Sequence, residues 1–427
     1  MASNMTHLPG RFHPIDYLKI TILGFALTAL WASLHSIVLP LRLLDFVPET
    51  LKNTYLGYLT FAGLILAMAV QPIAGAISDR SGFSWGRRRP FILVGVLLAM
   101  LFLPGIGAFA SYLAIFFVYC LLQISSNIAQ GTYQGFIPDL VPEEKRGLAS
   151  GVKGLMELLG GIALIRLIAY FMGQYTAGVG SSWLWLSLAA LAFILLGAML
   201  VTILTVKERP GIAGSQIPLL TTLRKAFKID VRAHRDFIWF LASRGLMGIP
   251  GVILQTFALY YLMDVVGIAN PAAVTADLLI VVGIFLLVVV YFAGRLSDKV
   301  GRMPIILSAG LLGALGVALL LFSKSYIQIM LSGALFGIAN GAFFSTSWAL
   351  ATDLAAKGEE ARYLGLTNLA MAGGSALARL IGPVIDFFNV YGPNLGYQVM
   401  LLVCFLCFVI GSLLILKVKS RRLTNVA

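Results

Sequence analysis

Long apolar runs constrain the fold of this chain more than any other feature. A lipid bilayer requires about 20 consecutive, mostly apolar residues for one helical span. Runs of this kind fall near 17–41, 55–77, 91–110, 112–138, 146–172, 183–206, 235–263, 273–296, 305–322, 325–352, 362–388 and 396–418. Backbone groups in lipid must form hydrogen bonds within their own segment, so each run is predicted to be a helix. The sequence therefore predicts an all-α membrane protein of twelve transmembrane helices.

Composition supports this prediction and excludes several functions. Only 11% of the 427 residues are charged, whereas a soluble protein needs roughly a quarter to cover its surface. Cys120, Cys404 and Cys407 lie inside apolar runs and are interpreted as small packing residues. We find no phosphate-binding glycine loop, no His/Cys metal cluster and no nucleophile elbow. We therefore expect no enzyme activity, no ATP-driven transport, no cofactor and no metal.

Lysine and arginine residues lie mainly in the loops on one side of the predicted helices. Only Arg42, Lys52 and Lys324 are predicted on the other side. This imbalance predicts that both termini lie in the cytoplasm. The net charge of +13 is therefore attributed to loops that lie beside membrane lipid, and not to binding of nucleic acid. The polar segment 207–234 is predicted to be a cytoplasmic linker between six-helix bundles at 1–206 and 235–427.

The two halves carry matching landmarks in the same order. The first landmark is Gly75-Ala-Ile-Ser-Asp79-Arg80 with Gly86-Arg87, and its match is Gly294-Arg-Leu-Ser-Asp298-Lys299 with Gly301-Arg302. The second is Asp139, Gly160-Gly161 and Arg166, matched by Asp353, Gly373-Gly374 and Arg379. Offsets of 219, 214 and 213 residues separate the copies. Parallel repeats of this kind predict a substrate site near the membrane midplane, between two bundles.

These loop motifs resemble those of the major facilitator superfamily. The family pattern G-x-x-x-D-[RK]-x-G-[RK] is matched in full at Gly294 to Arg302, and with a longer spacer at Gly75 to Arg87. The resemblance implies a gate at the cytoplasmic helix ends, which the acids hold together in the outward-facing state. Its predicted residues are Asp79, Arg80, Arg87, Asp139, Asp298, Lys299, Arg302 and Asp353. The alternative is that these basic loops only set the topology.

Part of the first half resembles the sucrose/proton symporters of plants and their animal and bacterial relatives, within the glycoside-pentoside-hexuronide:cation group. The resemblance rests on Ser78-Asp79-Arg80, Gly86-Arg87-Arg88-Arg89-Pro90, Trp31-Ala32 with Ser36 and Pro40, and Asn127-x-x-Gln130-Gly131. Gln123 and Gln134 stand where that family carries an acid and an arginine. Two charges implied in proton coupling and sugar binding are therefore neutral amides here.

Four amides form the strongest candidate for a binding surface. Gln123, Asn127, Gln130 and Gln134 are spaced to share one face of a helix. They can hydrogen-bond a neighbouring helix, or line a cavity and bind a polyhydroxylated ligand; we favour the cavity. Asn340 and Ser347 lie at the matching places in the second half. Trp31, Tyr133 and Trp348 offer apolar faces for a sugar ring.

Ionisable residues inside the predicted spans are functional candidates. Glu157 is the one acid placed well inside a span, since Asp16, Asp45, Asp264, Asp277 and Asp386 lie at helix ends or in loops. Glu157 is a candidate proton carrier, and the alternative is a structural pair with Lys153. His35 is a second candidate relay. Arg244 is a candidate anion contact, whereas Arg166 and Arg379 are repeat equivalents and indicate one structural role used twice.

The sequence thus predicts a monomeric secondary transporter for a neutral, hydroxyl-rich small molecule such as a sugar or glycoside, coupled to a proton or another cation. One alternative is a transporter of organic anions or amphiphiles that uses the buried arginines. The other is a membrane assembly factor that transports nothing.

Overall fold

The computed structural model of the chain describes residues 13–208, 235–355 and 360–418. Within these ranges, twelve helical segments are long and apolar enough to span a membrane. Each coincides with one of the predicted runs, so the predicted all-α, twelve-helix fold is confirmed. The predicted linker falls almost entirely outside the described residues.

The first half contains six spans, several of which join more than one helical element. They are α1 (Pro14–Ser33) with η1 (Leu34–Val38) and α2 (Leu39–Leu43), η2 (Glu49–Leu51) with α3 (Lys52–Asp79), α4 (Arg89–Phe102) with α5 (Gly105–Ala108), α6 (Tyr112–Tyr133) with α7 (Phe136–Leu140), η3 (Glu143–Lys145) with α8 (Arg146–Ala163) and α9 (Ile165–Thr176), and α10 (Ser182–Thr205).

The second half repeats this plan. Its spans are α12 (Arg235–Tyr261) with η4 (Leu262–Val266), α13 (Pro271–Val300), α14 (Arg302–Phe322), α15 (Tyr326–Leu354), α16 (Glu360–Arg379) with α17 (Ile381–Asn389), and α18 (Leu395–Ile415). The fifth span of each half is interrupted, at Leu164 and at Leu380, where the backbone leaves the helix for one residue. The duplication seen in the loops therefore extends to helix geometry.

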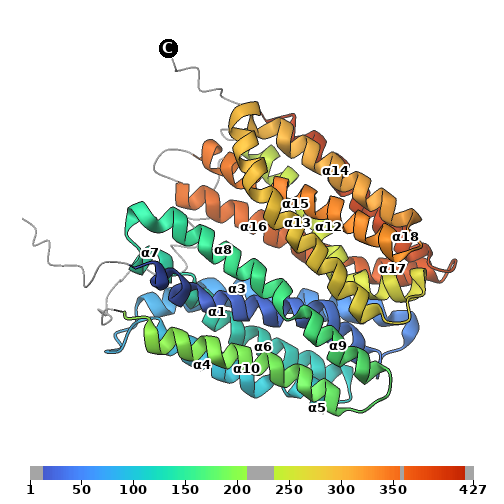
Figure 1. The fold of residues 1–427 in the computed structure, drawn as a ribbon, viewed down its shortest axis with the longest axis horizontal. Coiled ribbons are helices and arrows are strands. Elements are labelled where there is room, and N and C mark those ends of the chain that lie inside the picture. The colour runs from blue at the N-terminus through green and yellow to red at the C-terminus, as the bar shows by residue number, and fades with distance from the viewer. Residues whose placement is uncertain (1–12, 209–234, 356–359, 419–427) are drawn as a thin grey trace, which may run out of the picture.

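Helices pack most extensively within their own half (Figure 1). In the first half, α6 packs on α3 and α4, and α1 packs on α8 and α10. In the second half, α15 packs on α13 and α14, and α12 packs on α16 and α18. Two pseudo-symmetric contacts join the halves, because α9 lies on α13 and α17 lies on α3. The fifth span of each half thus contacts the second span of the other.

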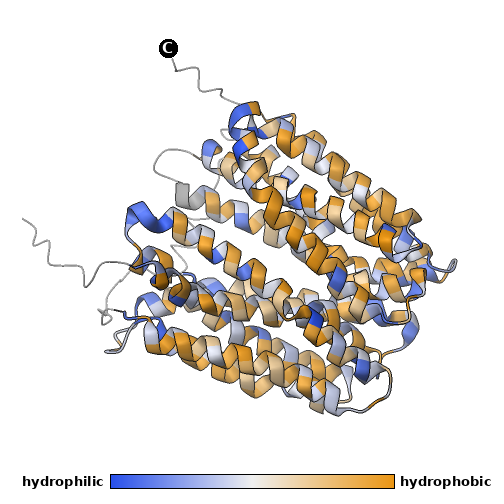
Figure 2. Cartoon of the chain, in the orientation of Figure 1, coloured by the Kyte–Doolittle hydropathy of each residue, from blue (hydrophilic) through white to orange (hydrophobic). Residues whose placement is uncertain are grey.

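The outer surface of the helices is apolar along most of their length, and hydrophilic residues concentrate at their ends (Figure 2). Large side chains such as Phe193, Leu204 and Phe322 are each more than 70% exposed. Exposed apolar surface this extensive needs lipid as its solvent. The protein is therefore an integral, multi-pass membrane protein. We call the end with the loops after α3, α7 and α13 the basic end, and the other end the opposite end.

Candidate functional site

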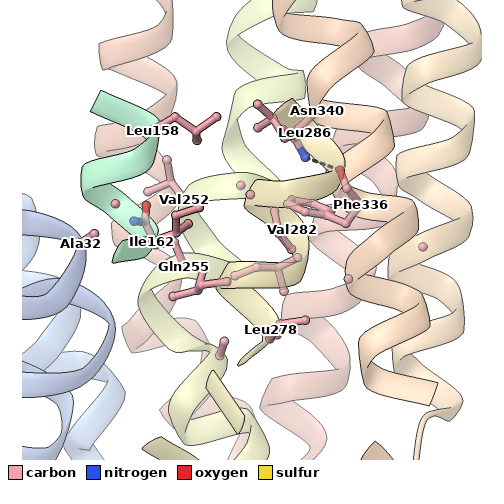
Figure 3. A pocket seen from close by; sticks show the side chains of 18 of the residues that line it. Ala32, Leu158, Ile162, Val252, Gln255, Leu278, Val282, Leu286, Phe336 and Asn340 are labelled. Atoms are coloured by element: carbon pink, nitrogen blue, oxygen red, sulfur yellow. Dashed lines mark hydrogen bonds between the residues drawn. The ribbon is translucent and has the colours of Figure 1, made fainter. Parts of the chain in front are cut away.

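A cavity of about 430 Å³ lies between the halves, near the middle of the spans. Its first-half wall comes from α1 and α8, and its second-half wall from α12 to α16 (Figure 3). Most of the lining is apolar, with Ile162, Val252, Leu278, Val282 and Leu286 among its residues. The polar lining residues are Thr28, Glu157, Gln255, Ser332, Asn340 and Ser375.

Asn340 and Gln255 present amides to this cavity from neighbouring helices (Figure 3). The Asn340 side chain donates to the Phe336 carbonyl oxygen at 2.9 Å, which fixes the orientation of the amide. Its Oδ1 lies near Gly251 of α12, which also lines the cavity. Asn340 is a predicted binding residue, whereas no sequence pattern had singled out Gln255.

Glu157 also lines the cavity, from the middle of α8. Its carboxylate lies 3.6 Å from Lys153 Nζ, and the side chain is 30% exposed. Lys153 in turn lies over the ring of Tyr133, 5.4 Å from its centroid. The structure thus contains the Lys153–Glu157 pair, and also exposes the acid to the space between the halves.

The four predicted amides do not line this cavity. Gln123 and Asn127 are each 4% exposed and hydrogen-bond to each other, while Gln134 follows the last residue of α6 and is exposed. The Oε1 atom of Gln130 is buried without a hydrogen-bond partner in the described structure. The other three amides belong to one hydrogen-bonded chain of side chains, in the order His35, Tyr119, Gln123, Asn127, Gln71 and Gln134.

Tyr119 and Gln71 are the links that the sequence did not reveal. Tyr119 contacts His35 Nε2 at 2.9 Å and accepts from Gln123 at 2.8 Å. Gln71 of α3 donates to Asn127 at 2.6 Å and accepts from Gln134 at 3.2 Å. His35 lies in the π-helical turn η1 with its ring 5.1 Å from that of Trp31. Such turns are frequent at functional sites.

Arg244, Ser347 and Trp348 form a separate cluster in the second half. Arg244 is 2% exposed and donates through Nη1 to the Ser347 hydroxyl. Its guanidinium lies over the Trp348 ring, 4.7 Å from the centroid. Tyr133, predicted as a sugar platform, instead lies buried in the first half, with its hydroxyl 3.4 Å from the Thr21 carbonyl oxygen.

The predicted gate residues of the first half converge on an arginine that the prediction omitted. Arg88, which is 5% exposed, binds Asp79 at 2.6 Å and Asp139 at 2.5 Å. Arg87 binds Asp139 as well, at 2.5 Å, and this hydrogen bond raises the pKa of Arg87. Arg80 caps the end of α3. A side chain at Gly135 would displace the Arg88 guanidinium from its place between these acids.

The second half repeats this cluster with greater exposure. Arg302 binds Asp298 at 2.5 Å and Asp353 at 3.2 Å, and donates to the Ser297 hydroxyl. Lys299 lies exposed in the last turn of α13. By geometry the counterpart of Arg302 is therefore Arg88, not Arg87 as the motif spacing had suggested. Arg88 and Arg302 are 214 residues apart, as are Asp139 and Asp353. This shared offset could have identified Arg88 as the counterpart of Arg302 from the sequence alone.

Polar contacts between the halves gather at the opposite end. Lys52 Nζ lies 2.7 Å from Asp264 Oδ1, and Arg166 lies 3.1 Å from Asp277. Asp386 accepts from the Asn53 side chain at 2.8 Å and from the Thr54 backbone N–H at 2.6 Å. Tyr397 connects these groups, because it bonds both Asn53 and Asp264. Asp386 does lie near a helix end, as predicted, but it is only 4% exposed.

Close backbone packing accompanies these polar contacts. A Cβ added at Gly57 of α3 would lie 2.6 Å from the Arg379 carbonyl oxygen, and one at Gly382 of α17 would collide with the Asn53 carbonyl oxygen. Both positions therefore require glycine. We call this group of contacts between α3, η4, α17 and α18 the seam.

Comparison with known proteins agrees with this architecture. The model of the Major Facilitator Superfamily matches residues 15–378 and, in a second match, 270–426. The structures of a D-xylose-proton symporter and of the nucleoside transporter NupG superpose with TM-scores of 0.74 and 0.70, at 16% and 15% identity. They cover 96% and 94% of this chain, which covers 98% and 99% of theirs. At such identity the likeness shows the fold alone.

Curated relatives match shorter stretches. Lactose permease of Leuconostoc lactis is 24% identical over 294 residues, which is 62% of this chain and 45% of that protein. Solute carrier family 45 member 4 of Homo sapiens is 30% identical over 169 residues, or 35% and 20% of the two chains. Sucrose transport protein SUT1 of Oryza sativa subsp. japonica is 31% identical over 124 residues, or 24% and 23%. The matches thus span less than half of each relative.

Family model, helix count and fold agree, and the chain belongs to the Major Facilitator Superfamily. This is a family of membrane transporters and not of enzymes, as the sequence predicted. Its members bind small molecules, often together with a cation.

Proposed function

We propose that the protein is a secondary active transporter that moves a small hydroxylated solute, a sugar or glycoside, by alternating access. The observation that carries this proposal is the cavity between two duplicated halves, which contact each other through the seam at one end. Its volume of about 430 Å³ lies within the range of small-molecule sites. Relatives named for lactose and sucrose transport support a sugar or glycoside as the solute.

The concentration of lysine and arginine at the basic end supports a cytoplasmic location for that end and for both termini. With this orientation, the seam closes the route from outside. The gate clusters around Arg88 and Arg302 would then hold cytoplasmic helix ends in the alternate state. In the described state each cluster connects elements of its own half.

The cavity wall suits a hydroxylated ring. Gln255 and Asn340 offer donors and acceptors to hydroxyl groups, and the apolar residues between them suit the C–H faces of a sugar. Gln123, Asn127, Gln130, Gln134, Trp31, Ser347 and Trp348 remain predicted contacts. Hydroxyl groups of a solute can replace the hydrogen bonds that the first-half amides form with each other.

Glu157 is the proposed site of proton coupling, with His35 as a proposed relay. The acid lines the cavity, and its contact with Lys153 at 3.6 Å is long enough to open without breaking a short hydrogen bond. Uptake of a proton by Glu157 would release Lys153 and change the charge of the cavity wall. Solute binding and proton binding would then influence each other at one place.

Purified protein in proteoliposomes that contain a pH-sensitive dye tests the proposal. Addition of a transported sugar should cause proton entry, and Glu157→Gln should abolish proton entry while solute exchange at equilibrium continues. Lys19→Gln, which removes a lysine paired with Asp16 at the start of α1, is the matched control and should behave as the unmodified protein. If no sugar or glycoside is carried, the proposal fails, and a non-transporting assembly role is favoured.

A further inference from the structure

Two arginines inside the second half lack an acidic partner among the described residues. Arg244 donates to the Ser347 hydroxyl, and Arg379 donates to the Ser375 carbonyl oxygen at 3.0 Å. The Nε atom of each is buried and has no hydrogen-bond partner in the described structure. Each guanidinium therefore keeps donor capacity that the protein does not use.

Because the two halves are duplicates, Arg379 can be compared with the residue at the matching position of the first half. Its counterpart Arg166, 213 residues earlier, binds Asp277 at 3.1 Å and the Ala273 carbonyl oxygen at 2.9 Å. Sequence alone had indicated one structural role for both arginines, and the structure corrects this, because Arg166 is paired with a carboxylate across the halves. Arg379 instead bonds within its own helix, to the Ser375 carbonyl oxygen, and its backbone lies against Gly57 of the first half. The two equivalent arginines therefore differ in their partners.

Neither unpaired arginine lines the cavity itself, but each lies one helical turn from a residue that does. Arg379 follows the cavity-lining Ser375 by one turn of α16, and Arg244 precedes the cavity-lining Gly248 by one turn of α12. Arg244 thus lies nearer the basic end than the cavity-lining part of its helix. The Trp348 ring lies over its guanidinium, Nη1 donates to Ser347, and the buried Nε has no partner among the described residues.

The charges around the cavity do not balance within the protein. Within residues 13–208, 235–355 and 360–418, Glu157 is the acid in the lining and is already paired with Lys153, so no described acid compensates the charges of Arg244 and Arg379. An unpaired charge in an apolar interior is costly, and such charges in membrane proteins are retained for function. A neutral solute would leave both arginines uncompensated, whereas an anion would pair with them.

We propose that the transported solute is an acidic sugar, a hydroxylated ring that carries a carboxylate. This inference rests on the proposed transport of a hydroxylated solute and narrows its class. Arg379 binds the carboxylate beside the first-half wall, while Gln255 and Asn340 bind the hydroxyl groups. Arg244 binds the carboxylate nearer the basic end as the solute leaves. Guanidinium groups suit this task because they bind carboxylates through two parallel hydrogen bonds.

Matched probes test the proposal with the full-length protein in proteoliposomes. The pairs are D-glucose with D-glucuronate and D-galactose with D-galacturonate, whose members differ in the group at C6. Cyclohexanecarboxylate supplies the carboxylate without hydroxyl groups. Uptake and the shift in melting temperature are measured for each probe. At least one sugar acid should be carried with a KM roughly tenfold or more below that of its neutral partner, the size expected for a charge-assisted hydrogen bond.

Arginine variants assign this preference to the two residues. Arg379→Gln and Arg244→Gln should each raise the KM for the acid roughly tenfold or more without changing the KM for the neutral partner. Lys19→Gln should change neither. A general loss of folding would lower the melting temperature without ligand, and Arg379→Lys and Arg244→Lys, which keep the charge, then serve as the second variants and should retain the preference for acids.

Three results would overturn the inference. Neutral sugars carried as well as their acids would overturn it while the proposed sugar transport stands. Cyclohexanecarboxylate carried as well as the sugar acids would show an anion transporter that does not recognise hydroxyl groups. Absence of flux and of melting shifts with every probe would count against the proposed function itself.

Discussion

Lys52 and Asp264, which belong to different halves of the protein, form an ion pair with 2.7 Å between Nζ and Oδ1. Lys52 is only 3% exposed, and it also lies over the ring of Tyr260. Tyr397 extends the pair to Asn53 and Asp386, so the seam is one connected polar group. If the halves alternate as we propose, this group must separate in every cycle.

Asp264→Asn is expected to favour the state that is open at the opposite end. The substitution leaves Lys52 buried without its carboxylate, which costs about 3–5 kcal/mol for a buried pair, and opening lets water reach Lys52. Spin labels at Thr50 and Val390, both exposed, would report a longer distance in pulsed electron paramagnetic resonance. Asp16→Asn, at a surface pair, is the control. An unchanged distance distribution in Asp264→Asn would contradict a latch at this pair.

Gly382→Leu should have the same effect by steric means. A side chain at this position collides with the Asn53 carbonyl oxygen, so α17 can no longer lie against α3. The label distance should increase, and solute uptake should fall to a small fraction of normal. Gly365→Leu in α16 is the matched control, because no atom lies near the added Cβ. Equal behaviour of the two variants would argue against close packing as the reason for glycine at 382.

The fold was predictable because lipid leaves few alternatives. A span needs a fixed length of apolar residues, and the landmarks around Asp79 and Asp298 repeat in order, so helix number and duplication follow from local sequence. Contacts between helices that are distant in the sequence, such as α17 and α3, leave no comparable pattern in the local sequence. Asn53 and Asp386, for example, are separated by 333 residues, and neither lies in a motif.

The candidate site was predictable only where the repeat or an isolated charge in an apolar run marked a residue. Asn340 was found through its counterpart Asn127, and Glu157 through its isolation in an apolar run. Gln255 has no comparable pattern, because a single amide in a long helix does not reveal which face it occupies. The amide row showed that polar side chains share a face, but the period of a helix cannot tell a cavity from a neighbouring helix such as α3.

Arg88→Lys is expected to destabilise the first half by about 2–3 kcal/mol, because lysine cannot bind Asp79 and Asp139 together through a planar fork. Arg302→Lys is the matched control. The Arg302 side chain is 24% exposed, against 6% for Arg88, and both of its partners are more than half exposed. Water therefore replaces the lost contacts, and the expected loss is at most about 1 kcal/mol. Thermal unfolding in detergent measures both. A larger loss for Arg302→Lys would refute the assignment of Arg88 as the buried member of the pair.

Glu208 provides a prediction about pH. Burial raises the pKa of this carboxyl above its usual value, although the Arg88 backbone N–H donates to it at 2.8 Å. The folded state therefore binds the proton more tightly than the unfolded state, so the cost of the buried charge is present at neutral pH and disappears as pH falls. Glu208→Gln should unfold at a higher temperature than the unmodified protein at pH 7, and the difference should shrink toward pH 4. A constant difference would contradict burial as the cause.

The alternating exposure of the central cavity can be measured without knowing the solute. A single cysteine at Ile162, which lines the cavity, is introduced after Cys120, Cys404 and Cys407 are replaced, and an impermeant thiol reagent is applied to either side of oriented vesicles. Faster labelling is expected from the basic side in the otherwise unmodified protein, and from the opposite side once Asp264→Asn is added. Labelling from neither side, or at rates that Asp264→Asn leaves unchanged, would contradict a cavity that opens to the two sides in turn.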